Sequence, residues 1–386
     1  MKRSTLLLAA LAALAACTDA GPTAGPGDPP PSAEGFAAST ELGRGFILGR
    51  AGTPVAVTFQ VVDGRAIFEG DIDLGPAASI ARTAEELTRR QGPSYGITVD
   101  GGTKRWPNRV IPYVIDAAVP NPSRVTDAIA HIEATTNLDF VARTTQTDYV
   151  RVTTVGANCY SVVGRQGGEQ LVQLSTSCDL GRTAHEFLHA AGMDHEQSRC
   201  DRDSYVEIRW ANIQPGLEPL FDKLCDGYTD VFSYDEGSIM HYAPTIGTWN
   251  GLPTIVSKRG RDSQMGQRTA LSANDIATVN WMYPIPAPTV TSVASNPSPA
   301  KQYLPFSITI NGSGFDPSTV EIRLLGAGSC PSPGCTPTSY STKTSTQLVI
   351  SSFSLSQPGT YTVNVRNGPT GLWSTNTHTV TLTPMY

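Results

Sequence analysis

The sequence HEFLHAAGMDH, from His185 to His195, is the most informative stretch of the chain. On an α-helix, His185 and His189 lie one turn apart on the same face, so both imidazoles can reach one ion. Glu186 lies about 100° further round the helix, beside such an ion rather than on it. Gly192 allows a sharp turn after the helix, and His195 can then return as a third ligand.

This spacing predicts a catalytic metal site. Three protein ligands leave a coordination position open for water, which distinguishes a catalytic zinc site from a structural one. Zinc lowers the pKa of its bound water to about 7, and Glu186 is placed to act as the general base. A lone HExxH is weak evidence, whereas the extended pattern H-E-x-x-H-x-x-G-x-x-H is far more specific. We therefore expect one catalytic Zn²⁺ and metal-assisted hydrolysis.

The composition indicates a chain of more than one domain with no nucleic-acid partner. The chain has 386 residues, of which 39% are hydrophobic and 16% charged, and a domain averages roughly 150 residues. Its 36 Gly and 29 Pro favour loops and β-structure. The formal net charge is −6, and no Lys/Arg-rich block is present. Both features argue against binding of nucleic acid.

The first residues have the pattern of an export signal. Lys2 and Arg3 precede the apolar run Leu6–Ala16, which is too short to cross a bilayer, since that needs about 20 residues. The run ends in Leu14–Cys17, which resembles the lipobox of bacterial lipoproteins and implies acylation of Cys17 and a membrane anchor. Ordinary cleavage near Ala16 or Ala20 is the alternative. We expect an exported product, either a bacterial cell-envelope lipoprotein or an extracellular protein.

The chain has seven cysteines, an odd number for an exported protein. If Cys17 carries lipid, the other six can form three disulfides in an oxidising compartment. Pairing between sequence neighbours would join Cys159 to Cys178, Cys200 to Cys225 and Cys330 to Cys335, although sequence alone does not prove connectivity. None has the paired CxxC spacing of a structural zinc site.

The remaining pattern divides the chain into segments. Strands are expected at 110–115, 149–155 and 171–174, an amphipathic helix opens at Pro122–Ser123, and a short helix is expected around 83–90. Beyond a linker at Ile285, short β runs at roughly 10-residue intervals indicate a small sandwich. We expect an α+β catalytic domain, with a small mixed sheet and the active-site helix, and then an all-β domain. The boundaries are 1–17 (signal peptide), 18–40 (tether), 41–96 (propeptide), 97–284 (catalytic domain) and 285–386 (β-sandwich).

Further motifs match one protease family. Ser238-Ile239-Met240-His241-Tyr242 has the form of a Met-turn, which proteins with the extended zinc motif also need. Glu196, Arg199 and Asp201–Asp203 follow the last histidine of the motif, and Gly266–Arg268, Leu271–Ser272 and Asp275–Ile276 follow further along. Over about Trp106 to Tyr283 the chain resembles the astacin family of metzincins. This resemblance implies a zinc endopeptidase that acts on polypeptide substrates.

The resemblance also implies roles for individual residues. His185, His189 and His195 would bind zinc, and Glu186 would act as base and then as proton donor. Tyr242 would be a switchable zinc ligand that helps to hold the oxyanion, and Met240 would form the floor beneath the metal. Glu196 would anchor the new N-terminus of the mature enzyme. Arg268 would line the pocket for the residue after the scissile bond and favour Asp or Glu there.

The stretch Phe68-Glu69-Gly70-Asp71 resembles the core of the astacin propeptide. Asp71 would then ligate zinc in the precursor and displace the catalytic water, because a carboxylate oxygen is an acceptable zinc ligand. Activation would need a second protease that cuts between Asp71 and Trp106, near Ile97. One departure is that Asn137 and Pro284 stand where the family usually has a cysteine bridge.

The C-terminal domain resembles an Ig-like domain of the IPT/TIG type at Asn311–Phe315 and Gln357–Val363, with an unknown ligand. Two other hypotheses compete with the protease. One is an inactive, adhesin-like lipoprotein, against which the intact Glu186 argues. The other is a module directed at peptidoglycan or polysaccharide, which lacks the paired carboxylates expected for glycosidic cleavage. Substitution of Glu186 by alanine abolishes cleavage only in the protease.

Overall fold

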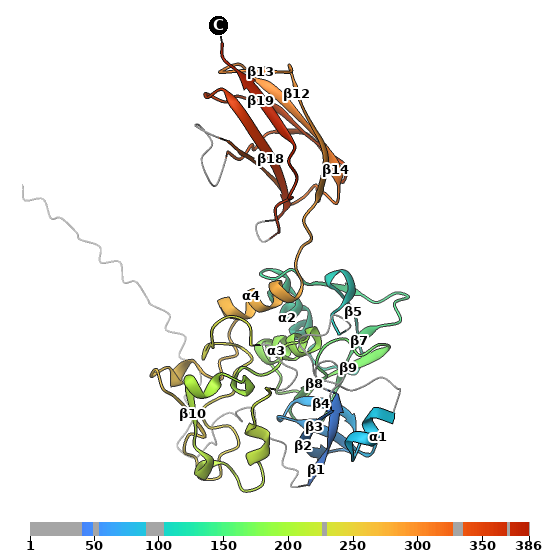
Figure 1. The fold of residues 1–386 in the computed structure, drawn as a ribbon. Coiled ribbons are helices and arrows are strands. Elements are labelled where there is room, and N and C mark those ends of the chain that lie inside the picture. Colours follow the sequence, from blue (N-terminus) through green and yellow to red (C-terminus); the bar gives the residue numbers. More distant parts are fainter. Residues whose placement is uncertain are drawn as a thin grey trace, which may run out of the picture.

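The computed structural model describes residues 41–48, 54–89, 104–225, 230–326, 335–368 and 371–385. Figure 1 shows a mixed α/β body followed by a separate β-sandwich at the C-terminal end. The predictions for the export signal, the tether, Cys17, Ile97 and Cys330 fall outside the described residues. Within the described ranges, no helix has the length and apolar character needed to span a bilayer.

One nine-stranded mixed sheet organises the α/β body, in the order β1-β2-β3-β4-β8-β9-β7-β5-β6. Its N-terminal strands form an antiparallel meander: β1 (Leu42–Leu48), β2 (Pro54–Val62), β3 (Arg65–Phe68) and β4 (Ile72–Pro76). The others are β5 (Val110–Ile115), β6 (Asp139–Ala142), β7 (Tyr149–Thr154), β8 (Cys159–Ser161) and β9 (Glu169–Leu174). The sequence predicted β5, β7 and β9 to within two residues.

The sheet is thus larger than the small mixed sheet expected, because the N-terminal meander joins it. The junction is a single parallel bridge between Ile72 and Ser161, where the Ser161 amide donates to the Asp71 carbonyl at 3.0 Å. Figure 1 shows the blue meander continuing below the green strands of the catalytic domain. A pairing of residues so distant in sequence has no local signature, which is why sequence patterns did not predict it.

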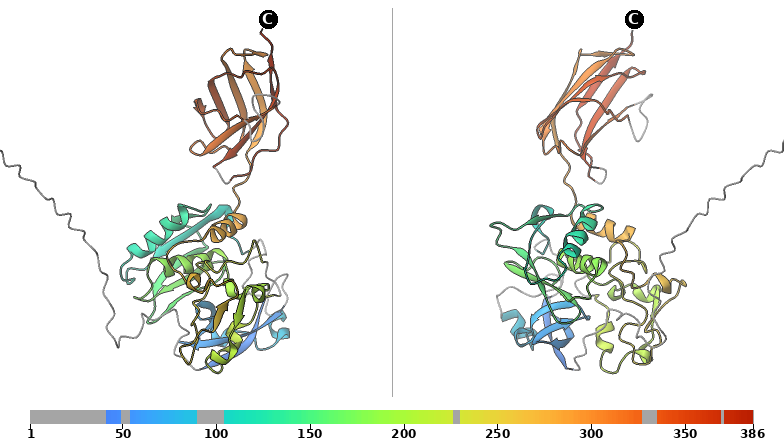
Figure 2. Two further views of the ribbon diagram at one scale, coloured as in Figure 1. Left: turned by 90° about the vertical axis from the view of Figure 1, so that its left-hand side faces the viewer. Right: turned by 180° about the vertical axis from the view of Figure 1, so that it is seen from behind.

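Helices pack against both parts of the sheet, α1 on the N-terminal strands and α2 and α3 on the catalytic strands. Their bounds are α1 (Ala84–Arg89), α2 (Ser123–Glu133), α3 (Leu180–Ala191) and α4 (Ala273–Met282). In α2, Val125, Ile129 and Ile132 lie on one buried face, as their spacing predicted. They share a core with Val172 and Leu174 of β9 and with Phe187 and Leu188 of α3, so α3 is firmly held between sheet and helices. The two other views in Figure 2 show α2 and α3 close together beside this sheet.

Residues after α3 form a loop-rich lobe with its own apolar cluster, which includes Phe221, Tyr234 and Tyr242. Its regular structure is the pair β10 (Val206–Ile208) and β11 (Ile255–Ser257) with several short 3₁₀ helices. Disulfides join Cys200 to Cys225 in this lobe and Cys159 to Cys178 beneath α3. Both pairs were expected from the sequence. The third expected pair includes Cys330, which is not among the described residues.

The C-terminal part is a sandwich of two four-stranded sheets, as the β runs predicted. One sheet holds β12 (Thr289–Asn296), β14 (Phe306–Ser313), β17 (Gln347–Phe353) and β16 (Tyr340–Lys343). The other holds β13 (Ala300–Lys301), β19 (Thr379–Thr383), β18 (Gly359–Asn367) and β15 (Val320–Leu325). Alternate residues such as Ile308, Ile310, Ile322 and Leu324 fill a core that shares no residue with the catalytic core.

Candidate metal centre and its precursor segment

Helix α3 carries the first two metal-binding histidines. The Asp179 side chain caps the helix by accepting from the Arg182 amide at 2.9 Å. At the other end Gly192 has a φ of 110°, a left-handed conformation that suits glycine and turns the chain sharply. The turn brings His195 back, so that its ring centroid lies 4.7 Å from that of His189 and 5.4 Å from that of His185.

Each of the three imidazoles is oriented through its Nδ1 atom. His185 donates to the Ile239 carbonyl at 2.8 Å, and His189 donates to the Met193 carbonyl at 2.7 Å. His195 donates to the Glu69 carboxylate at 2.8 Å. With Nδ1 protonated, the neutral ring has its lone pair on Nε2. All three Nε2 atoms are therefore available to one ion.

Asp71 completes a cluster of four metal-ligating groups with these histidines. Its carboxylate oxygens lie 3.2 Å from His185 Nε2, 3.7 Å from His189 Nε2 and 3.1 Å from His195 Nε2. The ligand atoms all lie within 4.8 Å of one another. Three imidazole nitrogens and one carboxylate oxygen form the donor set of a four-coordinate zinc site.

The charges at this site also fit a cation. His189 Nε2 is buried and makes no hydrogen bond within the described residues. Burial disfavours the charged form of His195, yet the Asp71 and Glu69 carboxylates outweigh it and raise the pKa of this imidazole to about 10. In a metal-free site a proton thus balances the Glu69 and Asp71 carboxylates, and a divalent ion can do the same.

Glu186 and the Met-turn surround the histidines. Glu186 is only 2% exposed and follows His185 on α3. Met240 is fully buried in the core with Phe187 and Leu188. The Tyr242 hydroxyl donates to the Glu69 carbonyl, and its ring centroid lies 4.8 Å from that of His195.

Asp275 at the start of α4 fixes the Met-turn. Its carboxylate accepts from the Ser238 hydroxyl at 2.6 Å and from the Ile239 amide at 2.9 Å. Because the Ile239 carbonyl in turn accepts from His185, α4 orients a metal ligand through this turn. From the sequence, Asp275 was identified only as part of a motif. Its role could not be predicted, because the contact joins distant segments.

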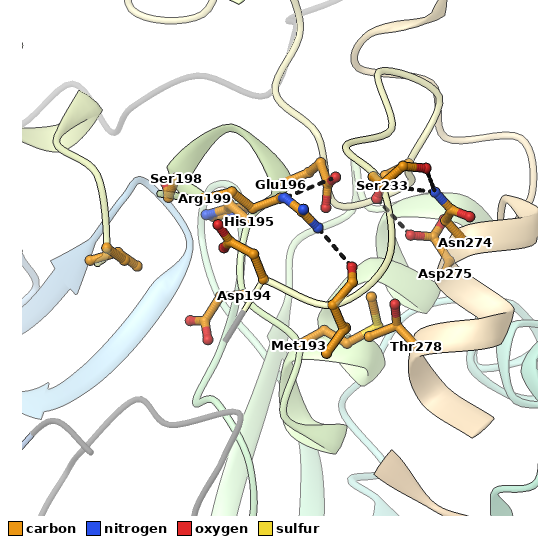
Figure 3. A pocket seen from close by; sticks show the side chains of 14 residues that line it. Met193, Asp194, His195, Glu196, Ser198, Arg199, Ser233, Asn274, Asp275 and Thr278 are labelled. Atoms are coloured by element: carbon orange, nitrogen blue, oxygen red, sulfur yellow. Dashed lines mark hydrogen bonds and ion pairs between the residues drawn. The ribbon is translucent and has the colours of Figure 1, made fainter. Parts of the chain in front are cut away.

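Glu196 lines a pocket together with Asp194, His195, Arg199 and Asp275 (Figure 3). Its carboxylate accepts from the Asp235 amide at 2.8 Å and lies 3.6 Å from the Arg199 guanidinium. Burial raises the pKa of Glu196 to about 8, against the opposing charge of Arg199. A largely buried carboxylate of this kind is a suitable partner for an ammonium group.

Arg268 lies near the metal cluster. The chain comes so close to α3 here that a Cβ on Gly181 would meet the Arg268 carbonyl at 1.7 Å. The guanidinium donates to the His241 carbonyl at 3.1 Å and, after burial, is the strongest influence lowering the pKa of His185. The structure therefore brings Asp71, His185, His189 and His195 into one cluster, with the Tyr242 ring beside His195.

Residues 98–284 match the sequence profile of the family described as Astacin (Peptidase family M12A). These residues form an astacin-family zinc metalloendopeptidase domain. The site of its zinc cofactor is the triad His185, His189 and His195.

Several known proteins are similar to this chain. Zinc metalloproteinase nas-13 from Caenorhabditis elegans is 40% identical over 196 residues, which are 49% of this chain and 43% of the relative. Zinc metalloproteinase nas-6 from the same organism is 36% identical over 222 residues, 56% of this chain and 62% of the relative. Among solved structures, the hatching enzyme high choriolytic enzyme 1 from Oryzias latipes is 34% identical. That match covers 47% of this chain and 92% of the other, with a TM-score of 0.43. This chain thus spans about half the length of the relatives it matches.

Two residues at the astacin site were not predicted from the sequence. Glu69 contacts His195 through its carboxylate and Tyr242 through its carbonyl. Ser198 donates to the second Glu69 carboxylate oxygen at 2.7 Å. Glu69 lies in the stretch that resembles the astacin propeptide. The signal in the sequence for a role near the metal was its position, two residues before Asp71.

Proposed function

We propose that the whole protein is an exported zinc endopeptidase that is synthesised as a latent precursor. The observation that carries the proposal is the Asp71 carboxylate lying among the Nε2 atoms of all three histidines. A carboxylate in this place occupies the position that the catalytic water needs. The segment from 41 to about 96 is then a propeptide, and the precursor is inactive until that segment leaves.

In the mature enzyme the bound zinc supplies Lewis acidity and lowers the pKa of bound water to about 7. Glu186 accepts a proton from the attacking water and passes it to the leaving amine. Tyr242, freed from the Glu69 carbonyl, donates its hydroxyl hydrogen bond to the oxyanion. Met240 and the rest of the Met-turn keep His185 aligned through the Ile239 carbonyl.

Activation is proposed to need a cut near Ile97 by another protease. The new terminal ammonium would then pair with Glu196 in its buried pocket, an interaction in which burial strengthens the attraction between opposite charges. Arg268 beside the metal cluster would favour Asp or Glu after the scissile bond. Because these roles depend on chain release, they belong to the trimmed enzyme rather than to the precursor.

The two disulfides are typical of a protein that folds in an oxidising, extracytoplasmic compartment. We further propose that Cys17 is acylated and anchors the protein to a bacterial membrane. The C-terminal sandwich would act as an Ig-like spacer or binding domain of the IPT/TIG type. The partners of the whole protein would be an activating protease and polypeptide substrates.

The test compares protein trimmed to begin at Ile97 with its Glu186→Ala variant and with the precursor. Zinc per chain is measured, and cleavage of a mixed peptide library is followed by mass spectrometry. We expect one zinc per chain in each protein and cleavage by the trimmed wild type alone. We also expect Asp or Glu as the residue that follows each cleaved bond. Bound zinc without cleavage by the trimmed wild type would instead indicate a binding protein.

A further inference from the structure

The three zinc-binding histidines differ in the group that accepts a hydrogen bond from their Nδ1 atom, the ring nitrogen that faces away from the metal site. His185 and His189 donate to main-chain carbonyls of the catalytic domain, at Ile239 and Met193. His195 instead donates to a carboxylate, that of Glu69, which belongs to the N-terminal meander. The outer partner of His195 is therefore charged and comes from the segment that activation would remove.

Glu69 is held in a specialised geometry. Its side chain is 1% exposed, and its two carboxylate oxygens accept from His195 and from the Ser198 hydroxyl at 2.8 and 2.7 Å. Its φ is +48°, followed by Gly70 at +84°. A non-glycine residue in the left-handed region is strained and persists only where its surroundings impose that conformation. This turn aims the carboxylate at His195 and the carbonyl at Tyr242.

A purely structural role accounts poorly for this arrangement. The Asp194 carboxylate is also buried, and its oxygens make no hydrogen bond within the described residues. Placing a second carboxylate here is unfavourable for the metal-free fold, whereas a bound cation offsets the excess negative charge.

We propose that Glu69 is a positioning residue for zinc, completing a carboxylate–histidine–metal triad through His195 that exists only in the precursor. The propeptide then does two things at the metal: Asp71 supplies a ligand, and Glu69 strengthens a ligand that belongs to the catalytic domain. A carboxylate that accepts from a ligating imidazole raises its basicity, and loss of such a partner typically costs about 10- to 100-fold in metal affinity.

This inference rests on the proposed function in one respect, the departure of the propeptide on activation. It makes the precursor the form that acquires and retains zinc most strongly, while the trimmed enzyme holds the ion more weakly. Release of the propeptide then removes both carboxylates together, and Tyr242 is freed at the same moment because its hydroxyl is held by the carbonyl of Glu69.

The test uses the full-length precursor with Asp71 intact. The dissociation constant for zinc is measured by competition with a chromogenic chelator for wild type, Glu69→Gln and Glu85→Gln. Glutamine keeps the size and an acceptor oxygen but removes the charge, and Glu85 is an exposed propeptide glutamate that serves as the matched control. We expect zinc binding about 10- to 100-fold weaker in Glu69→Gln and unchanged in Glu85→Gln. The visible spectrum of the cobalt-substituted protein should change only for Glu69→Gln.

Thermal unfolding of the metal-free proteins separates positioning from folding, because a structural role would lower the Tm without changing zinc affinity. If Glu69→Gln does not fold, Ser198→Ala is measured in its place. This variant removes one of the two hydrogen bonds that orient the Glu69 carboxylate, so we expect a smaller, several-fold loss of zinc affinity. Equal zinc affinity in the folded variant and wild type overturns the inference, even if the trimmed enzyme cleaves peptides. Failure of the trimmed enzyme to cleave overturns the proposed function, and the zinc comparison between precursors still decides the role of Glu69.

Discussion

At the scale of single residues, Asp71 has the most direct consequence for activity. In the precursor its carboxylate faces the Nε2 atoms of three histidines, so it competes with water for the metal. We expect the full-length Asp71→Ala variant to cleave a short fluorogenic peptide at least about tenfold faster than the wild-type precursor. A tenfold change corresponds to about 1.4 kcal/mol of the free energy by which Asp71 keeps the precursor inactive. The Asp71→Ala, Glu186→Ala double variant is the control, and an Asp71→Ala precursor as silent as wild type would contradict the switch.

Arg268 carries the second residue-scale prediction, which concerns specificity. A hydrogen bond between charged groups contributes about 1.5–3 kcal/mol, so trimmed Arg268→Gln should lose about 10- to 100-fold in kcat/KM for peptides with Asp after the scissile bond. Matched peptides with Asn there should change little. Because the guanidinium also donates to the His241 carbonyl, the ratio between the two peptides is the informative quantity. An equal loss for both would indicate that Arg268 only supports the Met-turn.

At the scale of elements, the Met-turn contains a histidine that must stay neutral. His241 is fully buried; its Nδ1 donates to the Tyr242 carbonyl at 2.7 Å, so its Nε2 accepts from the Tyr234 hydroxyl at 2.7 Å. Burial lowers the pKa of His241 to about 4, whereas an unfolded histidine has a pKa of about 6.5. Between these two pH values the unfolded chain binds more protons at His241 than the folded protein does. The contribution of neutral His241 to the free energy of unfolding is therefore fully present above about pH 6.5 and is lost as the pH falls towards 4.

This lowering of the His241 pKa corresponds to at most about 3.4 kcal/mol of stability. We therefore expect the free energy of unfolding of His241→Asn, measured by urea denaturation with a chelator present, to depend less on pH between 7 and 4.5 than that of wild type. The chelator makes the titration of the zinc ligands common to both proteins. Parallel pH profiles would show that His241 is already protonated in the folded protein or that other groups dominate this window.

Elements also explain how the domain manages without the bridge expected near Asn137 and Pro284. The Asn137 amide nitrogen Nδ2 donates to the Tyr283 carbonyl at 3.0 Å, and the Asn137 main-chain amide donates to Asn280 Oδ1 at 2.7 Å. Two hydrogen bonds thus tie the end of α2 to the end of α4. The sequence revealed the missing cysteines but not this replacement, because nothing local in Asn137 points to α4.

At the scale of the whole molecule, local patterns were predictable and long-range pairings were not. The zinc helix, Gly192 and the return of His195 follow from residues close together in sequence, and so do α2 and the strands of the sandwich. The continuation of the propeptide into the catalytic sheet rests on one bridge between Ile72 and Ser161. The contact of Glu69 with His195 spans an even longer stretch of chain, and no period or spacing in the sequence predicts it.

The separation of the two hydrophobic cores leads to a prediction about the C-terminal domain. The sandwich core and the catalytic core have no residue in common, and the short segment 283–288 connects α4 to β12. Elements that share no core usually unfold independently. We expect a chain ending at Pro284 to retain the zinc content, the catalytic-domain unfolding transition to within about 2 °C, and the kcat/KM of the trimmed enzyme on short peptides.

Calorimetry of the full-length protein should show a second transition that this truncation removes. Kinetics on a large protein substrate then separate two roles for the sandwich, because a spacer leaves kcat/KM unchanged whereas a substrate-binding domain raises KM when it is deleted. Loss of zinc or of the catalytic transition on truncation would mean that the sandwich stabilises the protease directly. The independence of the two domains inferred from their separate cores would then be wrong.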